Sequence, residues 1–223
     1  MNPATSGNPR RAFSLVELLV VIAILAVLVG VFLSGPRHDR AKALQVTCMS
    51  HLKQTVIGFV MWSDDNGGSL PWQVSSNQGG TLELIPNGRA ADHFLTLSNY
   101  LKDTGLLWCP TDLARDLTNN FSGFDNQNLS YFIGLDAITN NPFSILSGDR
   151  HLQVNGQLVK PGLLIVSNRA TFGWTKELHS RSSEPVGNVS FADGHVEVGG
   201  VRAGRLSATF QRQTTVTNRL AIP

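Results

Sequence analysis

Residues 10–35 read RRAFSLVELLVVIAILAVLVGVFLSG, and this stretch decides how the chain is organised. Two arginines come first, Glu17 follows a short junction, and the eighteen residues from Leu18 to Gly35 carry no charge. At about 1.5 Å rise per residue such a run forms a helix roughly 27 Å long, close to the ~30 Å hydrocarbon core of a bilayer. A charge at the edge of an apolar segment is costly without a partner, which makes Glu17 a candidate functional residue.

Two ordinary kinds of N-terminal segment also contain apolar runs. A secretory signal has an apolar stretch of about 7–15 residues with a small-residue cleavage site behind it. Here the run is longer, and no A-x-A site closes it. A plain signal anchor has no reason to carry a glutamate at its start, and no cysteine follows the run as it would in a lipoprotein signal.

The order of basic pair, junction, carboxylate and apolar run resembles the N-terminus of type IV prepilins and type II secretion pseudopilins. In that family an inner-membrane peptidase cuts before the apolar run and methylates the new N-terminus. The resemblance implies a cut between Ala12 and Phe13, N-methylation of Phe13, and an assembly role for Glu17 as the fifth residue of the mature chain. Ala12 departs from the glycine that usually precedes the cut, and it is similarly small.

Composition and periodicity divide the chain into five parts. Pro36 should kink a long helix that continues as an amphipathic helix to about Ser63, where Asp, Asn and Gly residues end it. The polar residues 201–223 should form a tail that is mobile at its end, with a short helix near 206–211. The parts are a leader (1–12), a transmembrane or filament-core helix (13–35), its amphipathic continuation (36–63), an exported globular domain (64–200) and a polar C-terminal tail (201–223).

The globular domain has the pattern of an α+β fold, in which the long N-terminal helix packs on a small antiparallel sheet as in a pilin. The clearest strand signal is 186–200, where apolar residues alternate on both sides of Asp193-Gly194, a strong hairpin turn. A short helix is expected over 92–102. Further strands are expected at 106–110, 130–135, 163–167 and 170–174.

Several scattered motifs resemble a large group of bacterial prepilin-like proteins. They include Met61–Pro71, Leu107–Asp112 and Asn188–Val196. The C-terminal element of that group is named for a histidine, nine residues and then Asp-Gly. Here Ser183 occupies the histidine position before Asp193, and the nearest upstream histidine is His179, so no role of that histidine is carried over.

Charge argues for a membrane rather than a nucleic-acid partner. Removing residues 1–12 takes away Arg10 and Arg11 and leaves 16 basic and 16 acidic side chains, so the mature chain has no basic stripe. The two arginines obey the positive-inside rule. They predict a single-pass inner-membrane protein with a cytoplasmic N-terminus and a periplasmic domain, later part of a pilus or pseudopilus. The partners that the resemblance implies are the prepilin peptidase/methyltransferase and other pilin or pseudopilin subunits.

The two cysteines, Cys48 and Cys109, would both be exported, and an oxidising compartment permits a disulfide between them. The alternative is two free, buried thiols, since the sequence does not give their separation. A disulfide would join the long helix to the globular domain.

No pattern of an enzyme or of a bound cofactor stands out. The six histidines are dispersed without metal-ligand spacing. Asp64, Asp65 and Asn66 could offer oxygen atoms to calcium, but they lack the full EF-hand pattern and a helix-ending turn explains them better. His195 beside Asp193 is better explained as an exposed strand residue after a turn than as a metal ligand.

The favoured function is therefore structural: a processed subunit that assembles into a type IV pilus or type II pseudopilus. A membrane-anchored protein that binds a surface polymer or secreted substrate is the alternative. An exported hydrolase using Asp64, Asp65, Asp193 and His195 is a third and weaker hypothesis.

Overall fold

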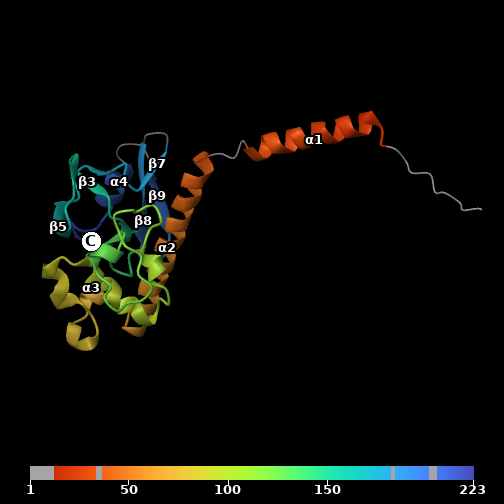
Figure 1. Cartoon of the computed structure of the whole chain (residues 1–223). Coiled ribbons are helices and arrows are strands. Elements are labelled where there is room, and N and C mark those ends of the chain that lie inside the picture. The colour runs from red at the N-terminus through yellow and green to blue at the C-terminus, as the bar shows by residue number, and fades with distance from the viewer. Residues whose placement is uncertain (1–12, 34–36, 182–183, 201–204) are drawn as a thin grey trace, which may run out of the picture. The chain divides into compact units, whose positions relative to one another are not determined.

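A computed structural model describes residues 13–33, 37–181, 184–200 and 205–223 (Figure 1). The chain divides into two compact units at the Arg40–Ala41 junction. The first unit holds α1 (Leu15–Leu33), and the second holds the globular domain together with most of α2 (Arg37–Asp65). The kink expected near Pro36 lies outside the described residues.

Apolar side chains surround α1 on every side. Their exposed fractions run from 78% at Leu15 to 45% at Val21. A helix that is hydrophobic all round needs an apolar environment to bury it. Within the part of the chain that the structure describes, none of the helices combines the length and apolar character that crossing a membrane requires. The last two residues of the segment expected from the sequence, 13–35, are not among those described.

Helix α2 packs on the globular domain through one stripe of buried residues. Cys48, Leu52, Val56 and Phe59 recur at intervals of three or four and are fully buried, as a helix of 3.6 residues per turn requires. The helix ends two residues beyond the expected Ser63, where Gly67 and Gly68 adopt positive φ and the Gly68 N–H donates to the Ser63 carbonyl at 2.9 Å.

The main sheet is antiparallel throughout, which gives the α+β architecture expected from the sequence. Six strands lie in the order β5-β10-β1-β2-β8-β7, and β9 pairs with β8 off this path. The Asp193-Gly194 turn joins β8 to β9 as expected. The strands are β1 (Tyr131–Gly134), β2 (Ile145–Asp149), β5 (Gly162–Ser167), β7 (His179–Arg181), β8 (Glu184–Phe191), β9 (Val196–Gly200) and β10 (Thr217–Ile222).

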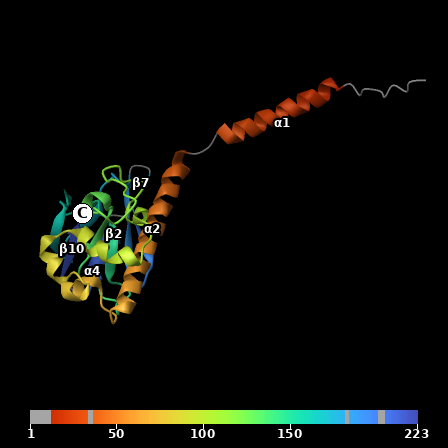
Figure 2. The same cartoon turned by 60° about the horizontal axis from the view of Figure 1, so that its bottom comes forward.

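The sheet separates two hydrophobic cores. Tyr131 and Ile133 of β1 belong to the core that contains the α2 stripe, whereas Phe132 between them belongs to the other. This alternation follows from the period of two along a strand. Helix α4 (Arg205–Gln211), at the position expected for a short helix, supplies Phe210 to the second core, stacked 3.8 Å from Phe172. Figure 2 shows α2 running along one side of the domain.

A small second sheet adjoins the second core. Its order is β4-β3-β6, from β3 (Leu152–Val154), β4 (Gln157–Leu158) and β6 (Phe172–Trp174). Strand β6 falls within the expected 170–174, but β3 and β4 were not expected.

Short helical turns fill most of residues 71–107. The expected helix over 92–102 is divided into α3 (Ala90–Phe94) and the 3-10 turn η4 (Leu95–Asn99). The strand expected over 106–110 is wrong, because η5 (Thr104–Leu107) occupies its start and the Cys109 N–H donates to the Ser130 hydroxyl instead of to a ladder. The other turns are η1 (Pro71–Gln73), η2 (Ser76–Gln78), η3 (Leu82–Asn87) and η6 (Asn126–Asn128).

The C-terminal end is part of the sheet and not the mobile tail that its polarity indicated. Strand β10 lies between β1 and β5 and pairs with both. Leu220, Ala221 and Ile222 are buried, and the Pro223 carbonyl accepts a hydrogen bond from Arg115 Nη2 at 2.8 Å. The last residues are therefore required to complete both cores.

We expect that deleting residues 217–223 prevents the domain from folding. The deletion removes the strand that pairs with both β1 and β5. Each backbone group of these strands that is then left buried without a hydrogen bond costs about 1–3 kcal/mol. Circular dichroism and limited proteolysis, compared with the full chain, measure the effect. A truncated protein that unfolds cooperatively near the full-chain midpoint would contradict it.

Candidate functional site

The first candidate site is the N-terminal turn of α1, where Ser14 is the residue before the helix. The Ser14 carbonyl accepts the Leu18 N–H at 3.2 Å, and its hydroxyl accepts the Val16 N–H at 3.3 Å. The Glu17 carboxylate accepts the Ser14 N–H at 2.9 Å. Together these bonds form a capping arrangement of the S-x-x-E type.

This cap fixes the direction of the Glu17 side chain. The carboxylate points back toward the start of the helix, where the helix dipole favours negative charge. Phe13 directly precedes the cap, whereas Ala12 lies outside the described residues. Sequence reasoning overlooked Ser14, although the spacing of Ser14 and Glu17 carried the signal.

Comparison with known proteins supports the N-terminal motif alone. Residues 7–33 match the prokaryotic N-terminal methylation motif of prepilin-type proteins. No curated protein and no solved structure matches the chain. The motif implies an exported, membrane-anchored protein that is processed by a prepilin peptidase. The match does not extend to the group with the histidine and Asp-Gly element, and Ser183 lies outside the described residues.

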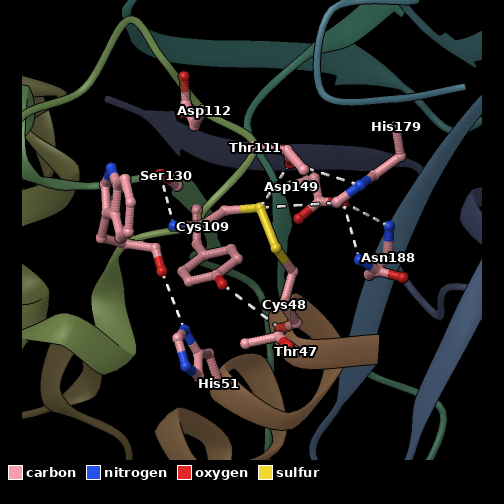
Figure 3. The surroundings of a disulfide bond; sticks show 12 residues. Thr47, Cys48, His51, Cys109, Thr111, Asp112, Ser130, Asp149, His179 and Asn188 are labelled. Carbon is pink, nitrogen blue, oxygen red and sulfur yellow. Dashed lines mark hydrogen bonds and ion pairs between the residues drawn. A yellow bond between two sulfur atoms is a disulfide. The ribbon is translucent and has the colours of Figure 1, made fainter. Parts of the chain in front are cut away.

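The second candidate site is a buried polar cluster around a disulfide (Figure 3). Cys48 of α2 and Cys109 are bonded, with their Cα atoms 5.2 Å apart and both side chains fully buried. The Tyr131 hydroxyl donates to the Cys48 carbonyl at 3.4 Å, and the His51 Nδ1 lies 3.0 Å from the Trp108 carbonyl. The bond therefore links the middle of α2 to the segment that leads into β1.

A histidine lies against one of the two sulfur atoms. The Nε2 of His179, on β7, is 3.5 Å from Cys109 Sγ and 3.6 Å from Oδ2 of Asp149. The Thr111 hydroxyl is 3.0 Å from the same sulfur and 3.4 Å from His179 Nδ1. A Thr111 hydroxyl that accepts the Nδ1–H leaves the Nε2 lone pair facing the sulfur and the carboxylate.

Asp149, at the end of β2, is a buried carboxyl without a strong counter-charge. Its Oδ2 accepts the Asn188 backbone N–H at 2.7 Å and the Asn188 side-chain amide at 3.1 Å. Its Oδ1 has no hydrogen-bond partner within the described part of the chain. Burial raises the pKa of Asp149 to about 7, and burial lowers the pKa of His179 to about 4.

A second set of charges lies beside this cluster but is fully paired. Arg150 donates to both oxygens of Asp112, at 2.7 and 2.8 Å. The guanidinium holds the pKa of Asp112 well below its usual range although burial acts in the opposite direction. The bidentate geometry is that of a strong, charge-assisted pair, so this Asp112 needs no further ligand.

Other residues singled out in the sequence have structural surroundings. The Asn66 side-chain amide donates to the Trp62 carbonyl at 2.7 Å, and Asp65 accepts the Tyr100 hydroxyl at 2.8 Å, so both belong to the end of α2. Asp193 and His195 hydrogen-bond each other at the exposed β8–β9 turn. Asp64 and Asp65 end α2, and no three of the four residues of the hydrolase hypothesis converge within the described part of the chain.

Reduction of the disulfide should lower the free energy of unfolding by about 4 kcal/mol, from the loop entropy of a 61-residue separation. Urea unfolding with and without a phosphine reductant measures the difference. The Cys48→Ala/Cys109→Ala double variant is the control and should not respond to the reductant. A loss below about 1 kcal/mol in the native chain would show that the bond contributes little.

Asp149 should contribute stability to the domain that decreases as pH rises. Between about pH 4 and pH 7 the folded chain keeps a proton on Asp149 that the unfolded chain has lost, so this group's contribution to stability falls as pH rises. His179 acts in the opposite sense, because the folded chain binds its proton more weakly.

The comparison of native chain and Asp149→Asn, which stays neutral, isolates the carboxyl. Relative to this variant, the native chain should lose on the order of 1 kcal/mol per pH unit across that window. Denaturant titrations at a series of pH values measure it, and parallel profiles would refute the assignment.

Proposed function

We propose that the chain is a prepilin-like structural subunit, cut before Phe13, N-methylated there, and assembled into a type IV pilus or a type II secretion pseudopilus. The observation that carries the proposal is the methylation motif over residues 7–33, with Glu17 held at the start of an apolar helix. The subunit would not be an enzyme.

The exposure of α1 supports a subunit that waits in the inner membrane and then enters a bundle of like helices. An apolar helix of 19 residues exposes large side chains on every face. Lipid or neighbouring helices would cover them, at roughly 25 cal/mol per Å² of apolar surface removed from water. The globular domain would lie on the periplasmic side.

Assembly would depend on charge neutralisation. Cleavage creates an α-amino group on Phe13, and Glu17 of one subunit would neutralise that group on a neighbour. Leaving either charge unpaired in an apolar bundle would cost several kcal/mol. The pair would therefore set the axial register of neighbouring subunits more than it would add net affinity. The Ser14 N–H holds the carboxylate toward the N-terminal end of its own helix, so the amino group of the neighbour would have to approach that end.

Mass spectrometry of the protein from native membranes tests the processing step directly. We expect a mature chain that begins with N-methylated Phe13. An unprocessed chain that still begins at Met1 would overturn the proposal and favour a tethered protein that binds a surface polymer or secreted substrate.

Glu17→Ala should be cut and inserted in the membrane normally but should not assemble. Glu17→Gln keeps an oxygen for the Ser14 N–H and removes only the charge, so it should fail equally if neutralisation is the cause. The filament or cross-linked fraction of the native host measures assembly. The matched control is Glu197→Gln, which removes an exposed carboxylate from the globular domain. Normal assembly of Glu17→Gln would refute the charge mechanism.

A further inference from the structure

The buried cluster contains three soft or borderline metal ligands from separate parts of the fold. Cys48 comes from α2, Cys109 from the segment before β1, and His179 from β7. Their ligand atoms lie within 4.8 Å of one another, and all three side chains are buried. Within the described ranges, no other group of three such residues converges in this way.

The distances to His179 fit a tetrahedral metal centre. With zinc–sulfur bonds of about 2.3 Å and zinc–nitrogen bonds of about 2.05 Å, a sulfur and a nitrogen ligand lie roughly 3.6 Å apart. Cys109 Sγ and His179 Nε2 are 3.5 Å apart. The two sulfurs would have to separate to about 3.8 Å, which requires that the disulfide be reduced.

Asp149 provides an independent indication that a cation could bind here. Its side chain is fully buried, and its Oδ1 has no hydrogen-bond partner among the described residues. Its Oδ2 lies 3.6 Å from His179 Nε2, although Asp149 is not one of the three residues whose ligand atoms converge. A divalent cation would supply the counter-charge that this carboxyl lacks, because buried charges are normally paired or bound to metal.

We propose that reduction of the Cys48–Cys109 disulfide creates a binding site for one zinc-class divalent cation, with Cys48, Cys109 and His179 as its ligands and the Asp149 carboxylate beside His179 as a counter-charge. A dithiol reductant supplies two electrons and two protons, which convert the disulfide into two thiols while the dithiol becomes a disulfide. Metal binding then releases both thiol protons, because the ligands are thiolates.

The site would give the fold two interchangeable ways to hold α2 on the sheet. In the oxidised state the tie is a covalent bond. In the reduced state the metal would join the same two residues and would add β7 through His179. Since a metal that binds only the folded chain stabilises it, the reduced domain would remain folded when the cation is present.

Cobalt(II) is the probe for the test, because thiolate-bound tetrahedral cobalt shows characteristic charge-transfer and d–d absorption. The full-length protein in detergent is titrated in the oxidised form and after reduction by a phosphine. Zinc should then displace the cobalt. We expect one equivalent bound by the reduced form alone, and at least roughly tenfold weaker binding by His179→Ala and Cys48→Ala. Asp149→Asn should weaken binding as well, and His195→Ala, an exposed histidine outside the cluster, should have no effect.

Thermal unfolding gives a second readout that does not depend on cobalt spectra. Zinc should raise the midpoint of the reduced protein and leave that of the oxidised protein unchanged, and it should slow reoxidation to the disulfide. If the reduced chain unfolds without metal, zinc should refold it. The proposal is overturned if folded, reduced protein binds no cobalt, if zinc neither stabilises nor refolds the reduced chain, or if His179→Ala binds cobalt with native affinity and spectrum.

Discussion

The disulfide between Cys48 and Cys109 fixes where α2 lies on the globular domain, because it joins the buried stripe of α2 to the segment that leads into β1. Around it, the Cys109 N–H donates to the Ser130 hydroxyl, and the Tyr131 hydroxyl donates to the Cys48 carbonyl. Helix, connecting segment and β1 therefore meet at a single buried point. The disulfide therefore prevents α2 from shifting along its axis. Such a shift would also break the hydrogen bond between Tyr131 and the Cys48 carbonyl.

The order of strands adds a second constraint, which concerns the end of the chain. Strand β10 is inserted between β1 and β5, so the sheet is not continuous until residues 217–222 have joined it. The N-terminal anchor and the central strand β10 lie at opposite ends of the sequence, so they are synthesised at different times. The anchor is made first, but the sheet of the domain is completed only after β10 has emerged. Pairings between such distant segments are slow to form because loop closure precedes their stabilisation.

Local patterns predicted the local parts of this structure. The apolar helix, the amphipathic stripe of α2 and the hairpin at Asp193-Gly194 each depend on residues close in sequence, where period and turn chemistry are decisive. The sequence did not predict β10, whose alternation is masked by polar residues. It also did not predict the cluster of His179 and Asp149, because only the pairing of β2, β7 and β8 brings these residues to the sulfur atoms. Ser14 was predictable, since its spacing from Glu17 is a known capping pattern.

Two carboxylates in this chain, Glu17 and Asp149, differ in the groups that lie beside them. The Glu17 carboxylate accepts the Ser14 backbone N–H at the start of α1, so one hydrogen-bond donor is in place before any partner arrives. Asp149 has two donors from Asn188 but is enclosed on all sides, and burial raises its pKa to about 7. A proton can neutralise it at no structural cost, whereas a cation needs ligands beside it. The imidazole of His179 lies there, and in the proposed site the two sulfur atoms would become its fellow ligands once the disulfide is reduced. The charge that Glu17 meets would come from another subunit, and the charge that Asp149 meets would come from solution once that bond is opened.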